Sequence, residues 1–278
     1  MDTVELPFGV LLRRWRTSRR MTQSDLAGVA ESSTRHLSCL ETGRAQPSRE
    51  MILKLAEHLE VPLRDQNALL LAAGFAPTFH ERPLGELASA RAAIDRVLQA
   101  HQPYPAFAVD RRWNVVLSNA ALPQLYEGCS PELLRPPVNA VRLILHPLGV
   151  APRVLNFAEW RAHTVAVLRR QIEARADPVI QALLREITSY PLPAGATAAA
   201  ATDGAERYAM PLRIATRLGT VSFLNTTTIF GTPTDVTLSE LALEMLFPAD
   251  EDTIGVVRAM VAEPAGGGQA ALAERGPD

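Results

Sequence analysis

The stretch TQSDLAGVAESSTRHLSCLETGRAQPSREMILKLAEHLEVP, residues 22–62, decides the fold of the N-terminal part of the chain. Thr22, with an acid three positions later, has the spacing of a capping box, which predicts that a helix begins there. Ser33, next to a second serine, can cap another short helix, and Gly43 supplies the left-handed residue that ends it. Ser48 can cap the next helix. The stretch is therefore predicted to form three short helices joined by tight turns.

The residues on either side extend this pattern to five helices. A preceding helix is predicted to run to about Arg20, because four apolar residues recur at helical spacing: Phe8, Leu11, Leu12 and Trp15. After the stretch, Pro62 opens a further helix that ends near Gly74. Five short helices with a tight turn between the second and the third are typical of a helix-turn-helix bundle.

The basic residues of the chain are concentrated near its N-terminus. The 278 residues together have a formal net charge of -2. Between residues 8 and 54, however, nine basic residues outnumber four acidic ones, so the local charge is nine minus four, or +5. The basic residues are Arg13, Arg14, Arg16, Arg19, Arg20, Arg35, Arg44, Arg49 and Lys54, and the acidic ones are Asp25, Glu31, Glu41 and Glu50. Such a surplus suits contacts with DNA phosphates, although a solvated helix face has the same composition.

These motifs together resemble the XRE-type, lambda-repressor-like DNA-binding domain over Phe8–Gly74. The shared elements are Gln23 with the pair LA that follows it, the sequence ETG in the third helix, and PS at the start of the fourth. The resemblance implies an all-α five-helix helix-turn-helix domain that binds double-stranded DNA. One departure is Glu31, which occupies a turn position where the family often has glycine, so the turn must form without a residue that favours positive φ.

The third helix is expected to enter the major groove, where its first turns present side chains to base edges. We expect Thr34 and Arg35 to read bases, with Ser33 and Cys39 next. Arg35 can form a bidentate contact with guanine, or it can contact phosphate alone, and the sequence leaves both alternatives open.

The resemblance also implies roles for polar residues around this helix. The residues expected to hold DNA phosphates are Thr22, Gln23, Thr42, Arg44 and Arg49. Glu41 is expected to form a structural ion pair with Arg16, because the matching acid of the family commonly bonds an arginine of the first helix. Dimers of such a domain bind two half-sites about one helical turn apart, so we expect a homodimer and a palindromic or nearly palindromic operator.

The remainder of the chain predicts a connector followed by strands and helices. Alternation over residues 104–119 predicts two strands joined by DRRWN, and Asn119 is expected to cap a helix after them. Helical stripes follow over residues 157–172 and after Asp177, and strands return over residues 208–231. Thr237 is expected to cap a last helix, with these residues on its core face: Leu238, Leu241, Ala242, Met245 and Leu246.

Two segments of this region, NAVRLILHPLGVAPRVLNFAEWRAH and FLNTTTIFGTPTDVTLSELALEMLFPAD, resemble the ligand-binding domain of MmyB-like (MltR-type) transcriptional regulators. The resemblance runs from about Tyr104 to Asp250 and implies an α+β PAS-like sensor domain, an antiparallel sheet with helices, that binds a lipophilic small molecule such as a fatty acid. A second domain that serves only dimerisation or partner binding is the alternative. The expected organisation is a helix-turn-helix DNA-binding domain over residues 1–76, a connector loop and helix over 77–103, the PAS-like ligand-binding domain over 104–262 and a disordered tail over 263–278.

Seven residues are candidates for contact with the ligand: Asn119, Arg142, His146, Asn156, Trp160, His163 and Asn225. A lipophilic ligand needs an apolar slot and one or two polar groups for its head. Arg142 and His146 are four positions apart and Trp160 and His163 are three apart, so on helices each pair would share a face. Structural roles are the alternative, because asparagine often caps helices, Arg142 can bond an acid and Trp160 can belong to the core.

The sequence also excludes several classes of protein. Cys39 and Cys129 are far apart and lack metal-ligand spacing, so neither a disulfide framework nor a metal site is expected. No segment has the roughly 18 apolar residues of a membrane span, and the N-terminus lacks the order of a signal peptide. Motifs of nucleotide-binding enzymes, serine hydrolases and zinc proteases are absent. We therefore expect a cytoplasmic, non-enzymatic regulator with no catalytic residues, no membrane partner and no cofactor other than a bound fatty acid or similar ligand.

Overall fold

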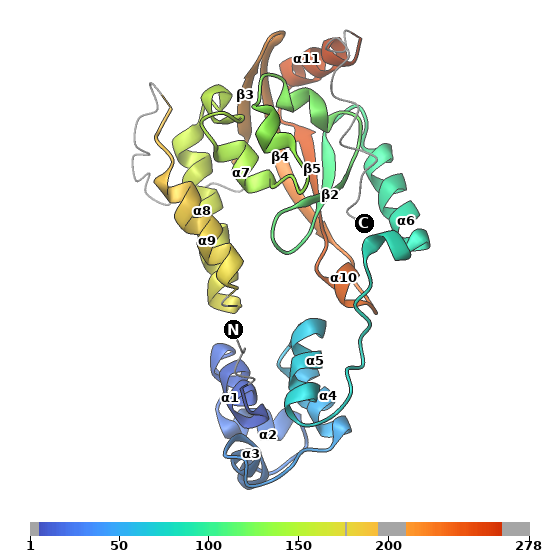
Figure 1. The fold of residues 1–278 in the computed structure, drawn as a ribbon, viewed down its shortest axis with the longest axis vertical. Coiled ribbons are helices and arrows are strands. Elements are labelled where there is room, and N and C mark those ends of the chain that lie inside the picture. Colours follow the sequence, from blue (N-terminus) through green and yellow to red (C-terminus); the bar gives the residue numbers. More distant parts are fainter. Residues whose placement is uncertain (1–5, 176, 194–209, 263–278) are drawn as a thin grey trace. The chain divides into compact units, whose positions relative to one another are not determined.

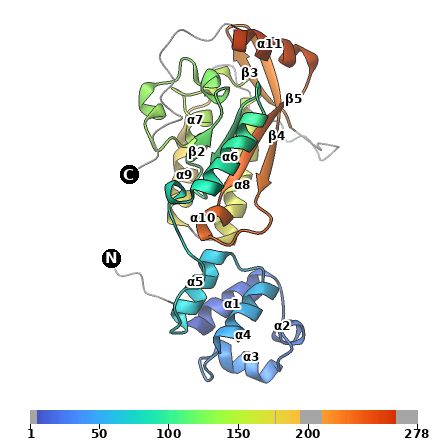
Figure 2. The same cartoon turned by 90° about the vertical axis from the view of Figure 1, so that its right-hand side faces the viewer.

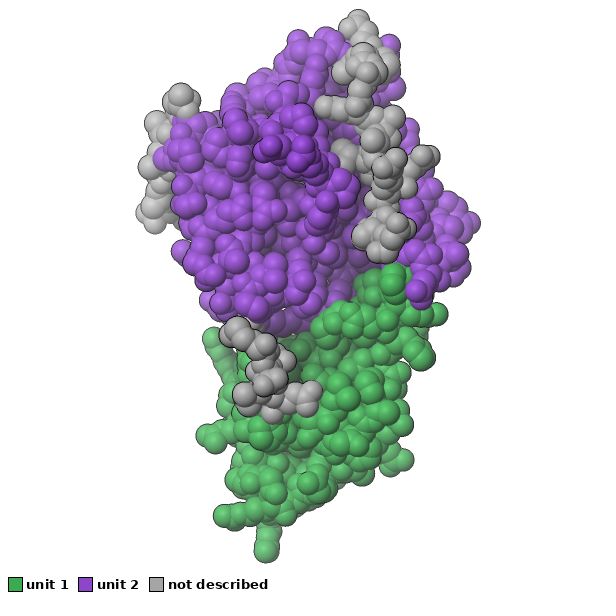
Figure 3. All heavy atoms as spheres, viewed as in Figure 1, with its two compact units in different colours: residues 1–83, 231–239 green, residues 84–230, 240–278 purple. Residues whose placement is uncertain are grey.

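The computed structural model describes residues 6–175, 177–193 and 210–262. The chain divides into two compact units, residues 1–83 with 231–239 and residues 84–230 with 240–278 (Figure 3). The short segment 231–239 thus belongs to the N-terminal unit, although it lies between two strands of the second. The tail predicted over residues 263–278 lies outside the described residues.

The N-terminal part of the first unit is a bundle of short helices. They are α1 (Phe8–Ser18), α2 (Gln23–Val29), α3 (Thr34–Glu41), α4 (Arg49–His58) and α5 (Leu63–Ala72) (Figure 1). Each helix contributes a fully buried leucine to one core: Leu12, Leu26, Leu37, Leu55 and Leu69. Helices of this length are marginal alone in water, so the burial of these side chains stabilises them.

Side-chain caps begin three of these helices, α2, α3 and α4, as predicted. Thr22 and Asp25 form a capping box, with Asp25 N 3.1 Å from Thr22 Oγ1 and Thr22 N 2.8 Å from Asp25 Oδ2. Ser33 and Ser48 each accept a hydrogen bond at 3.1 Å from the backbone N–H three residues later. Gly43 has a φ of 73° directly after the end of α3. This left-handed conformation is the one expected of a residue that terminates a helix.

The turn between α2 and α3 places a glutamate at positive φ. Glu31 has a φ of 51°, a conformation that costs a non-glycine residue about 1–2 kcal/mol. Backbone hydrogen bonds hold the turn, because Glu31 N donates to Gly28 O at 3.2 Å and Ser32 N donates to Ala27 O at 2.8 Å. The carboxylate of Glu31 also bonds the ammonium of Lys54 in α4. The residue that replaces the family's usual glycine therefore has a partner in a neighbouring helix.

The second unit is an α+β domain built on a five-stranded antiparallel sheet. Its strands are β1 (Ala106–Val109), β2 (Val115–Ser118), β3 (Leu212–Thr216), β4 (Gly219–Ile229) and β5 (Ala242–Pro248), in the spatial order β2-β1-β5-β4-β3. Its helices are α6 (Ala88–Ala100), α7 (Ala140–Leu145), α8 (Phe157–Ala174), α9 (Pro178–Ser189) and α11 (Glu251–Ala262). The predicted fold class, an all-α helix-turn-helix domain followed by an α+β PAS-like domain, is confirmed.

Helices cover both faces of the sheet. α6 packs against β1 and β2, and α8 lies along the opposite face (Figures 1 and 2). The strand register pairs Phe107 of β1 with Glu244 of β5, and Glu244 in turn with Thr227 of β4. Because alternate residues of a strand point to the same face, Leu246 and Asn225 share the face of Glu244. This arrangement places an acid on a central strand, on the side that faces α8.

The last helix predicted from the sequence is wrong, because residues 242–248 form β5 at the centre of the sheet. Thr237 begins no long helix, since α10 (Val236–Ser239) is a single turn and β5 follows it. The apolar residues that suggested a helix are Leu238, Leu241, Ala242, Met245 and Leu246. A strand buried on both faces has no clear polar alternation, so a short apolar run of this kind fits a helix or a strand equally well. Pairing with β1 and β4 decides between them.

Candidate DNA-recognition helix and ligand cavity

α3 has one face in the core of the first unit and the other in solvent. Its two leucines are buried, whereas Thr34 and Arg35 are exposed on its first turn. Ser33 precedes the helix, and its hydroxyl accepts the N–H of His36 at 3.1 Å as a cap. Cys39 is half-buried further along the helix. Of the residues predicted to read bases, Thr34 and Arg35 thus have the exposed, first-turn position that a contact in the major groove requires.

Side chains from three helices meet at the C-terminal end of α3. Glu41 accepts hydrogen bonds from Arg16 Nε at 2.6 Å, from Arg16 Nη2 at 2.9 Å and from Gln23 Nε2 at 2.8 Å. The side chains of Glu41 and Arg16 are only 3% and 11% exposed. Burial alone raises the pKa of Glu41, but the hydrogen bonds from Arg16 and Gln23 and the charges of Arg16 and Arg13 outweigh it, so this pKa is lowered. The bidentate pair fixes the position of α3 against α1.

The side chains of the residues predicted to hold phosphates make different contacts. Thr22 uses its hydroxyl in the capping box of α2, and Thr42 donates to a backbone carbonyl of α3 at 2.8 Å. Gln23 is engaged through its amide nitrogen with the carboxylate described above. Arg44 and Arg49 are exposed, and one nitrogen of Arg49 also donates to a threonine hydroxyl at 2.8 Å. These two arginines are the cationic members of the set.

The second unit contains a cavity of about 120 Å³ between the sheet and α8. Most of its lining is apolar or aromatic: Phe107, Trp113, Leu122, Leu125, Tyr126, Ala140, Val141, Ile144, Val150, Trp160, Val167, Leu212, Ile214 and Leu246. Polar side chains occupy four of the lining positions: His163, Thr164, Asn225 and Glu244. None of the described lining residues is lysine or arginine. An apolar slot with a few polar groups is the usual form of a small-molecule site.

Glu244 is the most deeply buried of the polar lining residues, with only 2% of its surface exposed. Its carboxylate accepts Asn225 Nδ2 at 2.7 Å and Thr227 Oγ1 at 3.0 and 3.2 Å. Burial raises the pKa of Glu244, although both hydrogen bonds act to lower it. Sequence reasoning missed this residue because its segment was assigned to a helix. As part of a strand, an acid between apolar neighbours in ALEML would have indicated a polar group on a buried face.

Three of the seven predicted ligand-binding residues line the cavity. Trp160 and His163 lie on α8 with their ring centroids 5.7 Å apart, and Asn225 lies on β4. Trp160 is buried, whereas His163 reaches solvent. Partial burial and then the charge of Arg170 lower the pKa of His163, so its imidazole is neutral at neutral pH.

The other four predicted residues do not line the cavity, and two of them lie near the end of α7. Arg142 donates to both carboxylate oxygens of Glu186, at 2.6 and 2.8 Å. His146 follows α7, and its ring packs against Tyr190 with a centroid separation of 4.9 Å. The helix ends before His146, so the shared helix face expected of the pair does not form.

The two asparagines outside the cavity bond to the backbone. Asn119 donates to the carbonyls of Leu98 and Tyr104 at 3.1 and 2.8 Å and accepts from Ala106 N at 3.1 Å. It therefore joins the end of α6 to β1, and the prediction that it caps a helix is wrong. Asn156 donates to a backbone carbonyl next to β3 at 2.8 Å and accepts a backbone N–H of β3 at 3.1 Å. This asparagine ties the start of α8 to the sheet.

Comparison with protein families assigns both parts of the chain. A helix-turn-helix domain model matches residues 7–70, the region of α1 to α5. The ligand-binding domain of MmyB-like transcription regulators matches residues 90–260, which is more than half of the chain and includes the sheet and the cavity. The chain belongs to the MmyB-like transcription regulator family. The predicted helix-turn-helix domain and the resemblance to MmyB-like regulators are thereby confirmed, and the two families matched by this MmyB-like regulator are regulatory modules rather than enzymes.

Other comparisons add little to this assignment. The clp gene regulator ClgR from Corynebacterium glutamicum is similar to this MmyB-like regulator at 26% sequence identity, over 37% of this chain and 97% of that chain. The TM-score of 0.22 is too low to establish a common fold. No curated protein matches the chain significantly. Within the described residues, no helix is both long and apolar enough to cross a membrane.

Proposed function

We propose that this MmyB-like regulator is a sequence-specific, cytoplasmic transcription factor whose DNA binding responds to a lipophilic small molecule. The cavity of the second unit supports the ligand part of the proposal, because its walls are almost entirely apolar and aromatic. Each methylene group buried there contributes about 0.8 kcal/mol to binding. The walls would thus suit the tail of a fatty acid, the ligand class that the family resemblance implies.

The exposed face of α3 supports the DNA-binding part. Thr34 and Arg35 project from its first turn, while Arg44 and Arg49 supply exposed positive charge next to it. In a homodimer two such helices would enter successive major grooves, about 34 Å apart, on a palindromic or nearly palindromic operator. The pair of Arg16 with a buried acid would keep each helix in position.

A hairpin connects the cavity to the DNA-binding unit. β4 and β5 carry Asn225 and Glu244, and residues 231–239 between these strands belong to the first unit. Within that unit, the buried carboxylate of Asp235 lies 3.1 Å from Arg82 Nε. The backbone N–H next to Asp235 donates to the carbonyl of the connector residue His80 at 2.8 Å. The tip of the hairpin is therefore fixed to the segment that follows α5.

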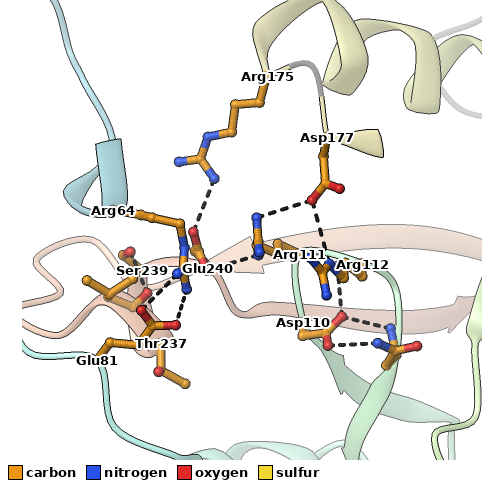
Figure 4. A network of polar contacts seen from close by, with 12 residues as sticks. Arg64, Glu81, Asp110, Arg111, Arg112, Arg175, Asp177, Thr237, Ser239 and Glu240 are labelled. Carbon is orange, nitrogen blue, oxygen red and sulfur yellow. Dashed lines mark hydrogen bonds and ion pairs between the residues drawn. The ribbon is translucent and has the colours of Figure 1, made fainter. Parts of the chain in front are cut away.

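The base of the same hairpin is fixed within the second unit. Glu240, whose side chain is 8% exposed, lies 3.6 Å from Arg111 Nε and 3.3 Å from Arg175 Nη1, and Arg111 also pairs with Asp177 at 3.2 Å (Figure 4). Only five positions separate Glu240 from Asp235, the residue that anchors the tip. We infer that a ligand acts through this doubly anchored segment, because it leads directly into β5, the strand that carries Glu244.

Native mass spectrometry of the purified full-length chain, followed by denaturing extraction, tests the proposed function. We expect a dimer with a lipophilic compound that extraction releases and whose return changes operator affinity. Ala140→Leu, which fills the cavity, should lose the compound, whereas Ala162→Leu on the exposed side of α8 should keep it. An empty dimer whose melting temperature is unaffected by a panel of lipophilic compounds would favour a domain used only for assembly.

A further inference from the structure

The carboxylate of Glu244 has capacity for a hydrogen bond from the cavity. A carboxylate offers about four acceptor positions. Among the described residues, one N–H of Asn225 and the O–H of Thr227 occupy two of them. Both donors lie on β4, along one side of the acid. A donor group on a molecule inside the cavity can therefore bond Glu244 without displacing either neighbour.

A ligand carboxylate would be disfavoured at this end of the cavity. Two carboxylates in contact in a low-dielectric site cannot both stay ionised, so a ligand carboxylate next to Glu244 requires that one of the two acids take up a proton, which costs free energy at neutral pH. The described lining contains no lysine or arginine to neutralise a second negative charge. Arg142, the arginine expected in this role, is engaged with Glu186 outside the cavity. His163 is neutral at neutral pH because its pKa is lowered.

One aromatic residue of the lining lies next to Glu244, and two others line the same cavity. Phe107 lies directly opposite Glu244 in the register of β1 and β5, and Trp113 and Trp160 also line the cavity. Aromatic ring faces attract ammonium groups, most strongly where water is excluded. An ammonium group next to Glu244 would also form a charge-assisted hydrogen bond, which is stronger than a bond between neutral groups. The acid and the rings thus complement a positively charged head with an apolar tail.

We propose that the cavity selects lipophilic amines, whose ammonium group donates a hydrogen bond to Glu244, over fatty acids of the same length. This inference rests on the proposed ligand-binding function and specifies its ligand class. Asn225 and Thr227 act as positioning residues, because their hydrogen bonds hold the carboxylate on the cavity side of the sheet.

Calorimetric titration of the full-length chain with octylamine, octanol and octanoate tests the inference, since these probes share one tail and differ only in the head group. We expect octylamine to bind at least about tenfold more tightly than octanoate. Glu244→Gln removes the charge at nearly constant volume and should weaken octylamine binding by about tenfold, with octanol binding changed less than about threefold. Glu251→Gln, which removes an exposed acid at the start of α11, is the matched control and should alter none of the three affinities.

The outcomes separate this inference from the proposed function. Octanoate binding as tight as octylamine binding overturns the amine preference and leaves ligand binding by the cavity intact. Binding of all three probes that is unchanged in Glu244→Gln also overturns it. If none of the probes binds or raises the melting temperature, the proposed function and the inference both fail. The wild-type ratio of octylamine to octanoate affinity decides alone if circular dichroism shows that Glu244→Gln is unfolded.

Discussion

Substitution of Glu41 by glutamine should destabilise the DNA-binding unit substantially. The substitution keeps the volume of the side chain but leaves the charge of Arg16 without its partner, at a site where the two side chains are 11% and 3% exposed. Breaking a buried ion pair by removing one partner costs about 3–5 kcal/mol. Glutamine retains one acceptor, and Arg16 Nη1 still donates to the carbonyl of Met21 at 2.7 Å. We therefore expect a loss of about 2–3 kcal/mol, a large fraction of the stability of a small domain.

Urea unfolding of the full-length chain, with hydrogen exchange of the α3 amides to report on the first unit, measures this loss. Glu60→Gln is the control, because Glu60 is 83% exposed and 3.8 Å from Arg19, so its removal should cost less than about 1 kcal/mol. The pKa of Glu41 is lowered on folding, so its stabilising contribution is present above the unfolded value of about pH 4.3 and is lost as the pH falls through the folded value. A loss no greater than that of the control would refute the claim that the pair is desolvated.

Three further predictions concern recognition and response. Arg35→Ala should leave the fold and weak, salt-sensitive DNA binding intact but remove about 1–3 kcal/mol of sequence discrimination; sequence preference retained in a binding-site selection would contradict base reading by Arg35. Glu244→Gln should stabilise the ligand-free chain more at high pH than at low pH. Burial raises the pKa of Glu244 on folding, so the free energy of unfolding of the wild-type chain falls as the pH rises through the pKa of the folded state, whereas glutamine does not titrate. Unfolding at about pH 4 and about pH 8 measures this, and an effect equal at both would be contrary to the expectation. Asp235→Asn should leave the affinity for ligand alone and the affinity for operator alone unchanged, but it should reduce the change in operator affinity that the ligand causes. If the ligand changes operator affinity as much as in the wild-type chain, the signal does not pass through residues 231–239.

The fold of the first unit was predictable because its signals are local. Thr22, Ser33 and Ser48 cap helices within three residues of themselves, and Gly43 ends α3 through its own backbone conformation. Such signals are complete within a few positions of the sequence. The positive φ of Glu31 was less accessible, because the lysine that bonds its carboxylate lies 23 positions away in another helix.

The second unit depends on contacts between distant parts of the chain, and prediction was weaker there. β5 is a strand because β1 and β4 pair with its two edges, and neither partner is visible in the segment itself. Arg142 was a reasonable ligand candidate by residue type, but both carboxylate oxygens of Glu186, which lies 44 positions away, accept hydrogen bonds from its Nε and Nη2. Trp160 and His163 were correctly paired because both lie within one continuous helix, where spacing alone determines the shared face.

The head group of the ligand, more than its tail, should determine the strength of regulation. A ligand changes operator affinity only by the difference between its affinities for two states of the protein. The walls contributed by α7 and α8 are remote from the hairpin tip in sequence, whereas Glu244 lies on a strand that leads directly to residues 231–239. A charge-assisted hydrogen bond contributes about 1.5–3 kcal/mol, so forming it in one state alone would change operator affinity by roughly ten- to a hundredfold. Octanol, which fills the walls without an ammonium group, should therefore occupy the cavity and alter operator binding far less than octylamine at equal occupancy. Equal effects of the two probes in a DNA-binding titration would place the signal in the walls instead.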